Sequence, residues 1–376
     1  MGDFLEGVKQ VFPGVERALS RRRLVTLNHP QLRMKYFGEI ARLAVGKGLR
    51  QPLWGDRIWE WQEKSLAREA ARLLESGEFS AYLGLEHAAL EALQAAKRLG
   101  VRTCLVFTSP HHAFRKKWVE DLAREHGIPI SEEEEELLRR GLERDRRRDE
   151  EMAVADVIRT NSSLVSQTLV AGGANPKKVV SVPLGADIGG MQPLRPRKKG
   201  EPVRFMVSGP VSLRKGGYFV LQAWKKLRPK GATLNFYGSM QMEMRAEDRG
   251  VTGVTFYGNR PQAEVQEAYR NSHVLIFPTL CDGFGMVVPE AMAAGCAVIT
   301  TKNAGAADWI EEGKNGWVVK PGDANALAEA IEKALDAGDR LEAMRAQAQE
   351  TARQNSWDHF RENFRQTLTR SLFLRA

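Results

Sequence analysis

The residues best suited to chemistry lie in one segment, residues 277–295, where an apolar run leads through a glycine-containing turn into an apolar helix. The run ends at Phe277, and Pro289 suits the first turn of the helix, where the N–H has no helical partner. A turn of this kind presents N–H groups at a helix N-terminus, which suits a phosphate. Asp282 and Glu290, eight residues apart, can accept hydrogen bonds from the hydroxyls of one ligand. A plain strand, turn and helix with two capping acids is the alternative.

A second polar segment, Ser208–Gly216, also follows a predicted strand. It carries Arg214 and Lys215, whose charges could neutralise a diphosphate as it leaves in a transition state. A solvated basic pair is the alternative. No Asp-x-Asp sequence is present, so the usual signal of a Mg²⁺ or Mn²⁺ diphosphate clamp is missing. No Gly-x-x-x-x-Gly-Lys-Ser/Thr sequence is present either, which disfavours a P-loop nucleotide triphosphatase.

Two histidines, His111 and His112, follow the predicted strand Val101–Thr108. Their place after a strand makes them candidates for a site at the carboxyl edge of a sheet. A structural or surface pair is the alternative. A metal site is disfavoured, because no acidic or cysteine partner lies at ligand spacing in the sequence. No metal ligand is therefore predicted.

The elements that must position these residues alternate between strand and helix, which predicts an α/β fold with parallel sheets. A linker at residues 186–202, rich in proline and basic residues, separates two domains, 1–185 and 186–355. We expect two doubly wound, Rossmann-like domains with ligands at the carboxyl ends of the strands. Predicted strands lie at 80–85, 101–108, 154–158, 178–182, 203–208, 232–237, 253–257, 273–278 and 297–301. Predicted helices lie at 31–47, 56–76, 87–98, 112–126, 132–151 and 163–172, with a helical tail from about 324.

Composition narrows the class of protein. The 376 residues are 43% hydrophobic and 27% charged, which is typical of a globular protein of about two domains. No run of 18 apolar residues and no apolar signal-peptide core is present. Three cysteines cannot form a disulfide framework, so a cytoplasmic location is expected. The net charge of +9 is concentrated in residues 151–250, with 16 basic against 7 acidic side chains. Phosphates, anionic lipid and nucleic acid are the partners that this charge suggests.

The turn segment resembles the Glu-x7-Glu signature of the retaining glycosyltransferases of family four, which have the GT-B fold. The similarity continues through three further segments, and two segments upstream resemble the family's basic phosphate loop and its hinge. The three are Ala297–Thr301, Asn303–Gly305 and Gly313–Asp323, and the two are Ser208–Gly216 and Val182–Asp187. Asp282 stands where the family usually has Glu, and Pro210 stands where it often has Arg.

The resemblance implies a retaining transfer of sugar from a nucleotide-diphosphate sugar, UDP- or GDP-linked, to an acceptor hydroxyl, with no metal and no tightly bound cofactor. The carboxy-terminal domain would hold the donor and the amino-terminal domain the glycan, lipid-linked or small-molecule acceptor. The implied catalytic residues are His111, Asp282, Arg214 and Lys215. The implied donor-binding residues are Gly209, Arg214, Lys215, Asn259, Arg260, Asp282, Gly283, Phe284, Gly285, Met286 and Glu290. A last helix, about 356–371, would pack back on the first domain.

The first 23 residues differ from the resembling family. They contain no convincing strand, whereas family members begin with one. The first domain is therefore expected to lack its first strand. This prompts an alternative function, a nucleotide-sugar or glycan-binding protein that has lost catalysis. A nucleic-acid-binding protein is a further alternative because the charge is basic, although no nucleic-acid module is recognisable. Peripheral contact with an anionic membrane is expected through Arg21–Arg23 or Arg195–Lys199.

Overall fold

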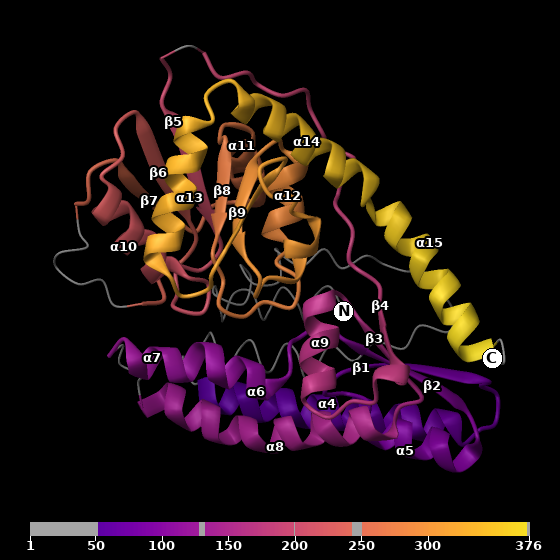
Figure 1. The fold of residues 1–376 in the computed structure, drawn as a ribbon. Helices are drawn as coiled ribbons and strands as arrows, with labels where there is room; N and C mark the ends of the chain where they lie inside the picture. Colours follow the sequence, from indigo (N-terminus) through magenta and orange to yellow (C-terminus); the bar gives the residue numbers. More distant parts are fainter. Residues whose placement is uncertain (1–51, 128–131, 199, 243–249, 374–376) are drawn as a thin grey trace, which may run out of the picture. The chain divides into compact units, whose positions relative to one another are not determined.

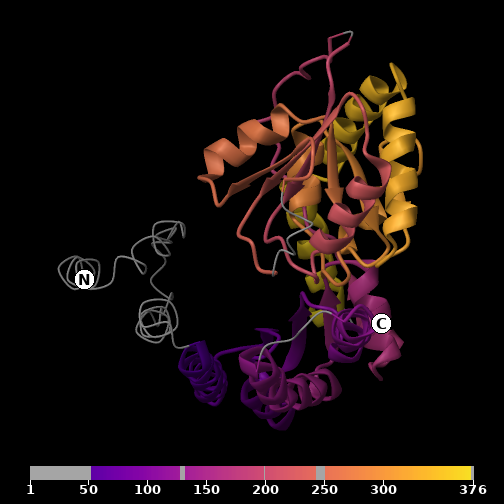
Figure 2. The same ribbon diagram turned by 90° about the vertical axis from the view of Figure 1, so that its left-hand side faces the viewer.

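The structure, a computed structural model, describes residues 52–127, 132–198, 200–242 and 250–373. It divides into two compact units (Figures 1 and 2). The first unit comprises the described residues up to Leu105 together with those of Ile130–Asp156, and the second comprises those of Val106–Pro129 and Val157–Ala376. The predicted domain boundary between residues 185 and 186 is a different division of the chain, and it stays a prediction.

Three helices make up most of the first unit, and they are α4 (Pro52–Leu74), α5 (Leu90–Leu99) and α8 (Glu132–Val154). Helix α5 ends at Gly100, whose φ of 69° is the left-handed conformation that closes helices when no Cβ is present. Helices α4 and α5 share a small apolar cluster that includes Leu74, Ala92 and Ala96. Ion pairs join α8 to α4, because Arg144 binds both Asp56 and Glu60.

A four-stranded sheet has the order β1-β2-β3-β4. Its strands are β1 (Ala81–Leu85), β2 (Arg102–Phe107), β3 (Val157–Thr160) and β4 (Val179–Ser181). The strand predicted at 154–158 is wrong at its start, because α8 continues to Val154. The Asp156 carboxylate accepts hydrogen bonds from the N–H and the hydroxyl of Thr103, at 2.9 and 3.0 Å, and these bonds mark the end of the helical segment. Helix α9 (Ser163–Ala171) follows β3 and is capped by the Ser162 hydroxyl.

The second unit contains a six-stranded sheet of order β10-β9-β8-β5-β6-β7, in which every registered pair is parallel. Its strands are β5 (Val203–Ser208), β6 (Ala232–Tyr237), β7 (Val254–Gly258), β8 (Val274–Phe277), β9 (Ala297–Thr301) and β10 (Gly316–Val319). Its helices are α10 (Gly217–Leu227), α11 (Gln262–Arg270), α12 (Val287–Ala293), α13 (Ala324–Asp336), α14 (Arg340–Gln354) and α15 (Trp357–Leu368). The order of strands reverses between β5 and β8, which is where doubly wound sheets bind ligands.

Apolar side chains on both faces of this sheet explain why its central strands read as continuous hydrophobic runs. Phe205 and Ile276 point into a core that α10, α13 and the start of α14 cover. Their neighbours Met206 and Phe277 point into a second core beneath α11, α12 and the end of α14. Successive side chains of a strand face opposite ways, so one strand supplies both cores. Figure 1 shows these helices around the sheet.

Three further expectations differ from the structure or fall outside it. The strand β10 was not predicted, and the helix expected at 112–126 is divided into α6 (His112–Arg115), a π-helical turn and α7 (Leu122–Glu125). The predicted elements before residue 52, including the missing first strand, lie outside the described residues. The last helix is α15, whose Phe360 and Phe364 rings lie 5.0 and 5.1 Å from the guanidinium carbon of Arg159 in β3.

Candidate functional site

Two loops meet at the point where the strand order of the six-stranded sheet reverses. The loop after β5 carries Arg214 and Lys215, and the loop after β8 carries Asp282. The Arg214 carbonyl accepts hydrogen bonds from the N–H of Leu280 at 2.8 Å and the hydroxyl of Thr279 at 3.0 Å. The two loops are therefore joined backbone to backbone, which fixes where the charged side chains emerge.

Asp282 is the centre of this cluster. Its Oδ2 forms an ion pair with the Lys215 ammonium and lies 3.8 Å from the Arg214 guanidinium. Its Oδ1 accepts the N–H of Phe284 at 3.2 Å. Arg214 also donates to the carbonyl of Cys281 at 3.1 Å, and its side chain remains 45% exposed. The cluster thus presents two cations to one carboxylate, which leaves it one positive charge in excess.

The turn after Asp282 gives the backbone a conformation that requires glycine. Gly285 has φ of +87°, and a Cβ there would lie 2.5 Å from the Phe277 ring. Within the described part of the chain, the N–H groups of Gly285 and Met286 donate no hydrogen bond, whereas that of Phe284 is bound to Asp282. Of the backbone N–H groups of the three predicted donor-binding residues Phe284, Gly285 and Met286, two are therefore available to an anion, and that of Phe284 would have to leave Asp282.

Glu290 lies on α12 within a chain of hydrogen bonds that sequence reasoning missed. Its Oε2 is 3.4 Å from the hydroxyl of Tyr269, which donates to the Ser208 hydroxyl at 2.7 Å. Burial raises the pKa of Glu290, and the charge of Asp187 raises it further, while the Tyr269 hydrogen bond lowers it. Ser208 is the last residue of β5, and this position at the carboxyl end of a strand could have marked it as a site residue. Tyr269 lies on α11, and no local sequence pattern marks it as a site residue.

The remaining predicted donor residues lie at the ends of β5 and β7. Gly209 donates its N–H to the carbonyl of Tyr237 at 2.8 Å. Asn259 and Arg260 are exposed, and the guanidinium of Arg260 lies 6.0 Å from the Tyr257 ring. The rings of Tyr237 and Tyr257 stack with centroids 4.5 Å apart and an interplanar angle of 7°. A stacked aromatic pair beside these residues is a surface on which a planar base could lie.

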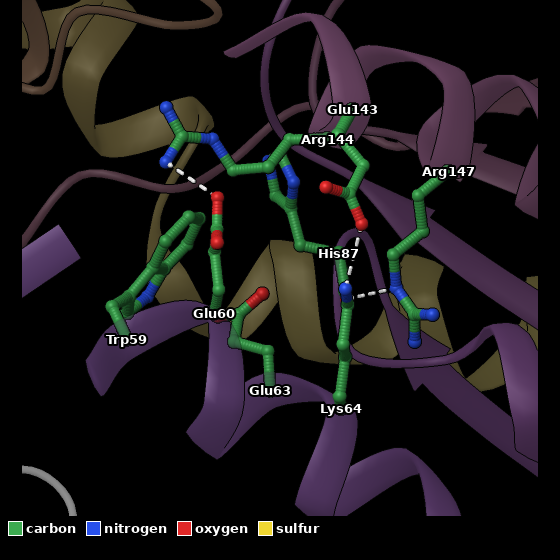
Figure 3. A pocket seen from close by; sticks show the side chains of 8 residues that line it. All are labelled: Trp59, Glu60, Glu63, Lys64, His87, Glu143, Arg144 and Arg147. Atoms are coloured by element: carbon green, nitrogen blue, oxygen red, sulfur yellow. Dashed lines mark hydrogen bonds and ion pairs between the residues drawn. The ribbon is translucent and has the colours of Figure 1, made fainter. Parts of the chain in front are cut away.

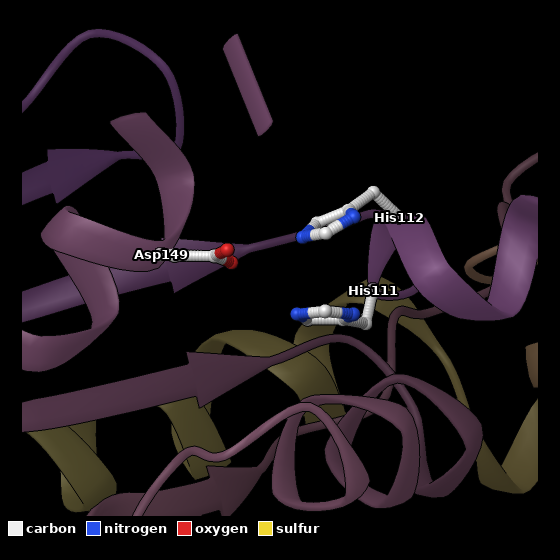
Figure 4. A group of neighbouring side chains, drawn as sticks. All are labelled: His111, His112 and Asp149. Carbon is white, nitrogen blue, oxygen red and sulfur yellow. The ribbon is translucent and has the colours of Figure 1, made fainter. Parts of the chain in front are cut away.

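His111 is buried and held in one orientation. Its N–H donates to the Thr168 hydroxyl at 3.1 Å, and its Nδ1 accepts the N–H of Ala113 at 3.2 Å. An accepting Nδ1 leaves the proton of a neutral ring on Nε2. The His112 ring faces it (Figure 4), with the ring centroids 4.0 Å apart and the planes tilted by 34°. A Cβ at Gly172 would lie 2.3 Å from the His111 ring, so glycine there makes room for it.

The loop that follows β2 contacts the turn after β8. A Cβ on Gly283 would lie 1.8 Å from the carbonyl oxygen of Thr108, so only glycine permits this approach. Ser162 donates its hydroxyl to the carbonyl of Gly283 at 2.7 Å, and Ser163 donates to Asp308 at 2.6 Å. These serines were not predicted, because contacts over more than 100 residues leave no local signal. The turn that carries the predicted donor contacts is therefore braced by the segment bearing His111.

A pocket that was not predicted from the sequence lies in the first unit. Trp59, Glu60, Glu63 and Lys64 of α4 line it opposite His87 and the α8 residues Glu143, Arg144 and Arg147 (Figure 3). Burial raises the pKa of Glu63 to about 7 and lowers that of His87 to about 4. His87 is then neutral at neutral pH and Glu63 is about half protonated, while the arginines around them are already paired with Asp56, Glu60 and Glu91. The arginines of the pocket are therefore already occupied by acidic partners.

Comparison with known proteins agrees with the arrangement of the second unit. Residues 194–353 match the model of the family described as glycosyl transferases group 1. This part of the chain, which holds the loops after β5 and β8, is similar to that family, and the fold is of the GT-B class. Within the described residues, no helix has the length and apolar character needed to cross a membrane.

Two curated relatives at about one-third identity match smaller parts of the chain. It is 33% identical over 128 residues to the capsular polysaccharide biosynthesis glycosyltransferase CapM of Staphylococcus aureus, which is 32% of this chain and 34% of CapM. It is 33% identical over 119 residues to the D-inositol 3-phosphate glycosyltransferase of Corynebacterium urealyticum, which is 31% of this chain and 28% of that enzyme. The match thus spans about a third of the length of these curated relatives.

A solved structure is similar over more of the chain. Anabaena Alr3699/HepE in complex with UDP matches with a TM-score of 0.59 at 16% identity, covering 81% of this chain and 83% of HepE. At that identity the similarity shows the fold alone.

Proposed function

We propose that this protein transfers a sugar from a nucleotide-diphosphate sugar to an acceptor hydroxyl with retention of configuration. The observation that carries the proposal is the cluster in which Arg214 and Lys215 meet Asp282 at the reversal of strand order. The group 1 family match covers these residues, and the resemblance to family four supports retention. UDP is the first nucleotide to test, because HepE is described in complex with it; GDP is the other candidate.

The cluster suits a leaving diphosphate. As the glycosyl–phosphate bond breaks, negative charge develops on the phosphate oxygens, and fixed cations stabilise it more in the transition state than before. Arg214 and Lys215 would take this role, and the N–H groups of Gly285 and Met286 would add two donors. When Lys215 turns to the phosphate, the Asp282 carboxylate is released to accept a hydroxyl of the sugar. Two cationic side chains at this place are the reason to propose that no metal is required.

Nucleotide recognition would use the other predicted residues. Glu290 would accept hydrogen bonds from the ribose hydroxyls, and its raised pKa favours a partner that donates. Asn259 and Arg260, next to the stacked Tyr237 and Tyr257, would receive the base. Gly209 leaves room for the diphosphate at the end of β5.

Retention requires the acceptor hydroxyl to attack from the face that the diphosphate leaves. The bond from sugar to phosphate oxygen breaks, the bond from sugar to acceptor oxygen forms, and the acceptor proton passes to the leaving phosphate. His111, with its proton on Nε2, would face the donor sugar as a hydrogen-bond donor. The acceptor is a glycan, a lipid-linked sugar or a small molecule with a hydroxyl group.

Calorimetric titration with UDP, GDP and ADP tests the donor site. We expect one nucleotide to bind, and Glu290→Ala to weaken it by about tenfold, the loss of one charged hydrogen-bonding partner. Glu332→Ala is the matched control, because Glu332 is an exposed helical acid of α13 and should leave the affinity unchanged. If no nucleotide binds to the folded protein, the proposed activity is withdrawn.

Turnover is then tested with sugars on the nucleotide that binds. NMR of the product anomer reports retention, and addition of a chelator tests independence of metal. Nucleotide binding without turnover of any donor would favour the alternative, a nucleotide-sugar-binding protein that has lost catalysis. An inverted product or loss of activity with the chelator would contradict the corresponding part of the mechanism.

A further inference from the structure

The outward face of α4 has an unusual composition. Its exposed side chains are two tryptophans, one leucine and three arginines, with no acidic residue among them, and they are Trp54, Arg57, Trp61, Leu66, Arg68 and Arg72. Trp54 is 55% exposed and Trp61 is 58% exposed. Large aromatic side chains are normally among the most buried, so two on one exposed helix face need an explanation.

Helical spacing places all but one of these side chains in one stripe. With 3.6 residues per turn, the two tryptophans and the three arginines lie within an arc of about 60°, along about 27 Å of helix. Leu66 lies outside this arc. The guanidinium of Arg57 lies 4.8 Å from the Trp54 ring. The acidic residues Asp56 and Glu60 lie outside this arc and bind Arg144. We call Trp54, Arg57, Trp61, Arg68 and Arg72 the α4 stripe.

The arginines of the α4 stripe are available to an external anion. Among the described residues, Arg57, Arg68 and Arg72 form no ion pair, whereas exposed arginines elsewhere, such as Arg361 and Arg365, pair with an acid three residues away. The predicted membrane-contact residue Arg195 is likewise paired, with Glu267. The predicted Arg21–Arg23 lie outside the described residues. The α4 stripe thus carries one arginine between two exposed indole rings and two more arginines beyond Trp61, none of them ion-paired within the described residues.

We propose that the α4 stripe docks the protein on the surface of an anionic lipid bilayer. Indole rings favour the region of the lipid headgroups, where the ring is apolar and the N–H stays hydrated. Arginines beside them bind lipid phosphates, and their alkyl stems lie along the apolar boundary. The apolar side of α4 is held in the first unit, so the helix lies on the membrane surface and does not enter the bilayer. This docking is independent of the proposed transfer reaction.

Sedimentation with sucrose-loaded vesicles of phosphatidylcholine, with and without phosphatidylglycerol, tests the docking. We expect binding to the anionic vesicles that decreases with salt. The triple variant Arg57→Gln, Arg68→Gln, Arg72→Gln should weaken it by about 100-fold, since each arginine near an anionic surface contributes about fivefold. The double variant Trp54→Ala, Trp61→Ala should weaken it by about tenfold or more, because the indole rings are lost.

A charge-matched control separates docking from the net charge of the protein. The triple variant Arg353→Gln, Arg361→Gln, Arg365→Gln removes the same charge from exposed positions on α14 and α15 and should bind as the wild type does. All substituted side chains are exposed, so circular dichroism should show unchanged folding. The proposal is overturned if the wild type does not bind anionic vesicles, if the α4 variants bind as tightly as the wild type, or if the control loses binding equally.

Discussion

Glu151 offers the sharpest test of how the first unit is held together. Its side chain is fully buried on α8, and its two oxygens accept the N–H groups of His87 at 2.7 Å, Ala89 at 3.0 Å and Leu90 at 3.1 Å. These bonds close the turn from β1 into α5, where Ala89 supplies no side-chain cap. Burial raises the pKa of Glu151, while the three N–H groups and Arg147 lower it. The turn therefore depends on a side chain more than 60 residues away.

The cost of substitution follows from the number of N–H groups left without a partner. Glu151→Gln keeps one acceptor oxygen, which can serve Ala89 and Leu90, but turns an NH₂ group towards His87. One orphaned, buried N–H costs about 1–3 kcal/mol. Glu151→Ala orphans all three and leaves Arg147 without this carboxylate, so the expected loss is about 3–5 kcal/mol.

Urea unfolding measures the loss, and amide hydrogen exchange of a peptide covering 85–92 locates it. Glu143→Gln is the control on the same helix, because the ion pair of Glu143 with Lys64 is largely exposed and contributes at most about 1 kcal/mol. We expect the exchange of the 85–92 amides to accelerate in Glu151→Gln and to be unchanged in Glu143→Gln. Equal stability of Glu151→Gln and the wild type would refute the argument that this carboxylate closes the turn.

Three further predictions concern both units. Lys215→Met should lower kcat by about 100-fold with a smaller change in KM, because the lost charge acts mainly on the leaving phosphate; steady-state kinetics measures this. Gly283→Ala should lower the melting temperature and turnover, because its Cβ would lie 1.8 Å from the Thr108 carbonyl; calorimetry and an activity assay check both. The raised pKa of Glu63, about 7 against 4.5, means that the folded state keeps a proton that the unfolded state releases between these values. The wild type therefore loses stability as pH rises through this window. The Glu63→Gln variant has no carboxyl group to titrate there, so its free energy of unfolding should rise relative to that of the wild type by about 1–2 kcal/mol between about pH 5 and 7.5, after allowance for solvent screening. Urea titrations of both proteins at the two pH values measure this difference.

The sequence predicted best what depends on local pattern. Strands β8 and β9 are buried on both faces, so β8 appears as an unbroken apolar run and β9 as an apolar run that ends in two threonines. The strand β10 was missed because four residues between glycine-rich turns carry too little periodicity. At the end of α8, Val154 and Ala155 suit a helix or a strand equally well, and the hydrogen bond from the Thr103 N–H to the Asp156 carboxylate forms only in the folded chain.

The residues of the candidate site also differ in how far the sequence could predict them. Arg214, Lys215 and Asp282 were predictable because each follows a strand and the strands are parallel, so their carboxyl ends meet at one edge. The hydrogen bond from Tyr269 to Ser208 was not predictable, because it joins a helix to a strand 61 residues away. The same holds for Ser162, whose contact with Gly283 exists only once the chain has folded.

The aspartate at position 282 has a local reason to differ from the glutamate usual in the resembling family. Its Oδ1 accepts the N–H two residues further on, from Phe284, which is the closed ring that aspartate forms in turns. A side chain with one more methylene would enlarge that ring and weaken this bond. The same short side chain keeps Oδ2 paired with Lys215, so one residue orders the turn and also holds the cation in place before a donor arrives. In the proposed reaction, a donor would have to displace this intramolecular ion pair, and part of its binding free energy would go into that exchange. Compared with glutamate, Asp282 would thus reach less far towards a sugar hydroxyl, but it holds the turn in its folded conformation. The neighbouring N–H donors would then need less ordering when a ligand binds.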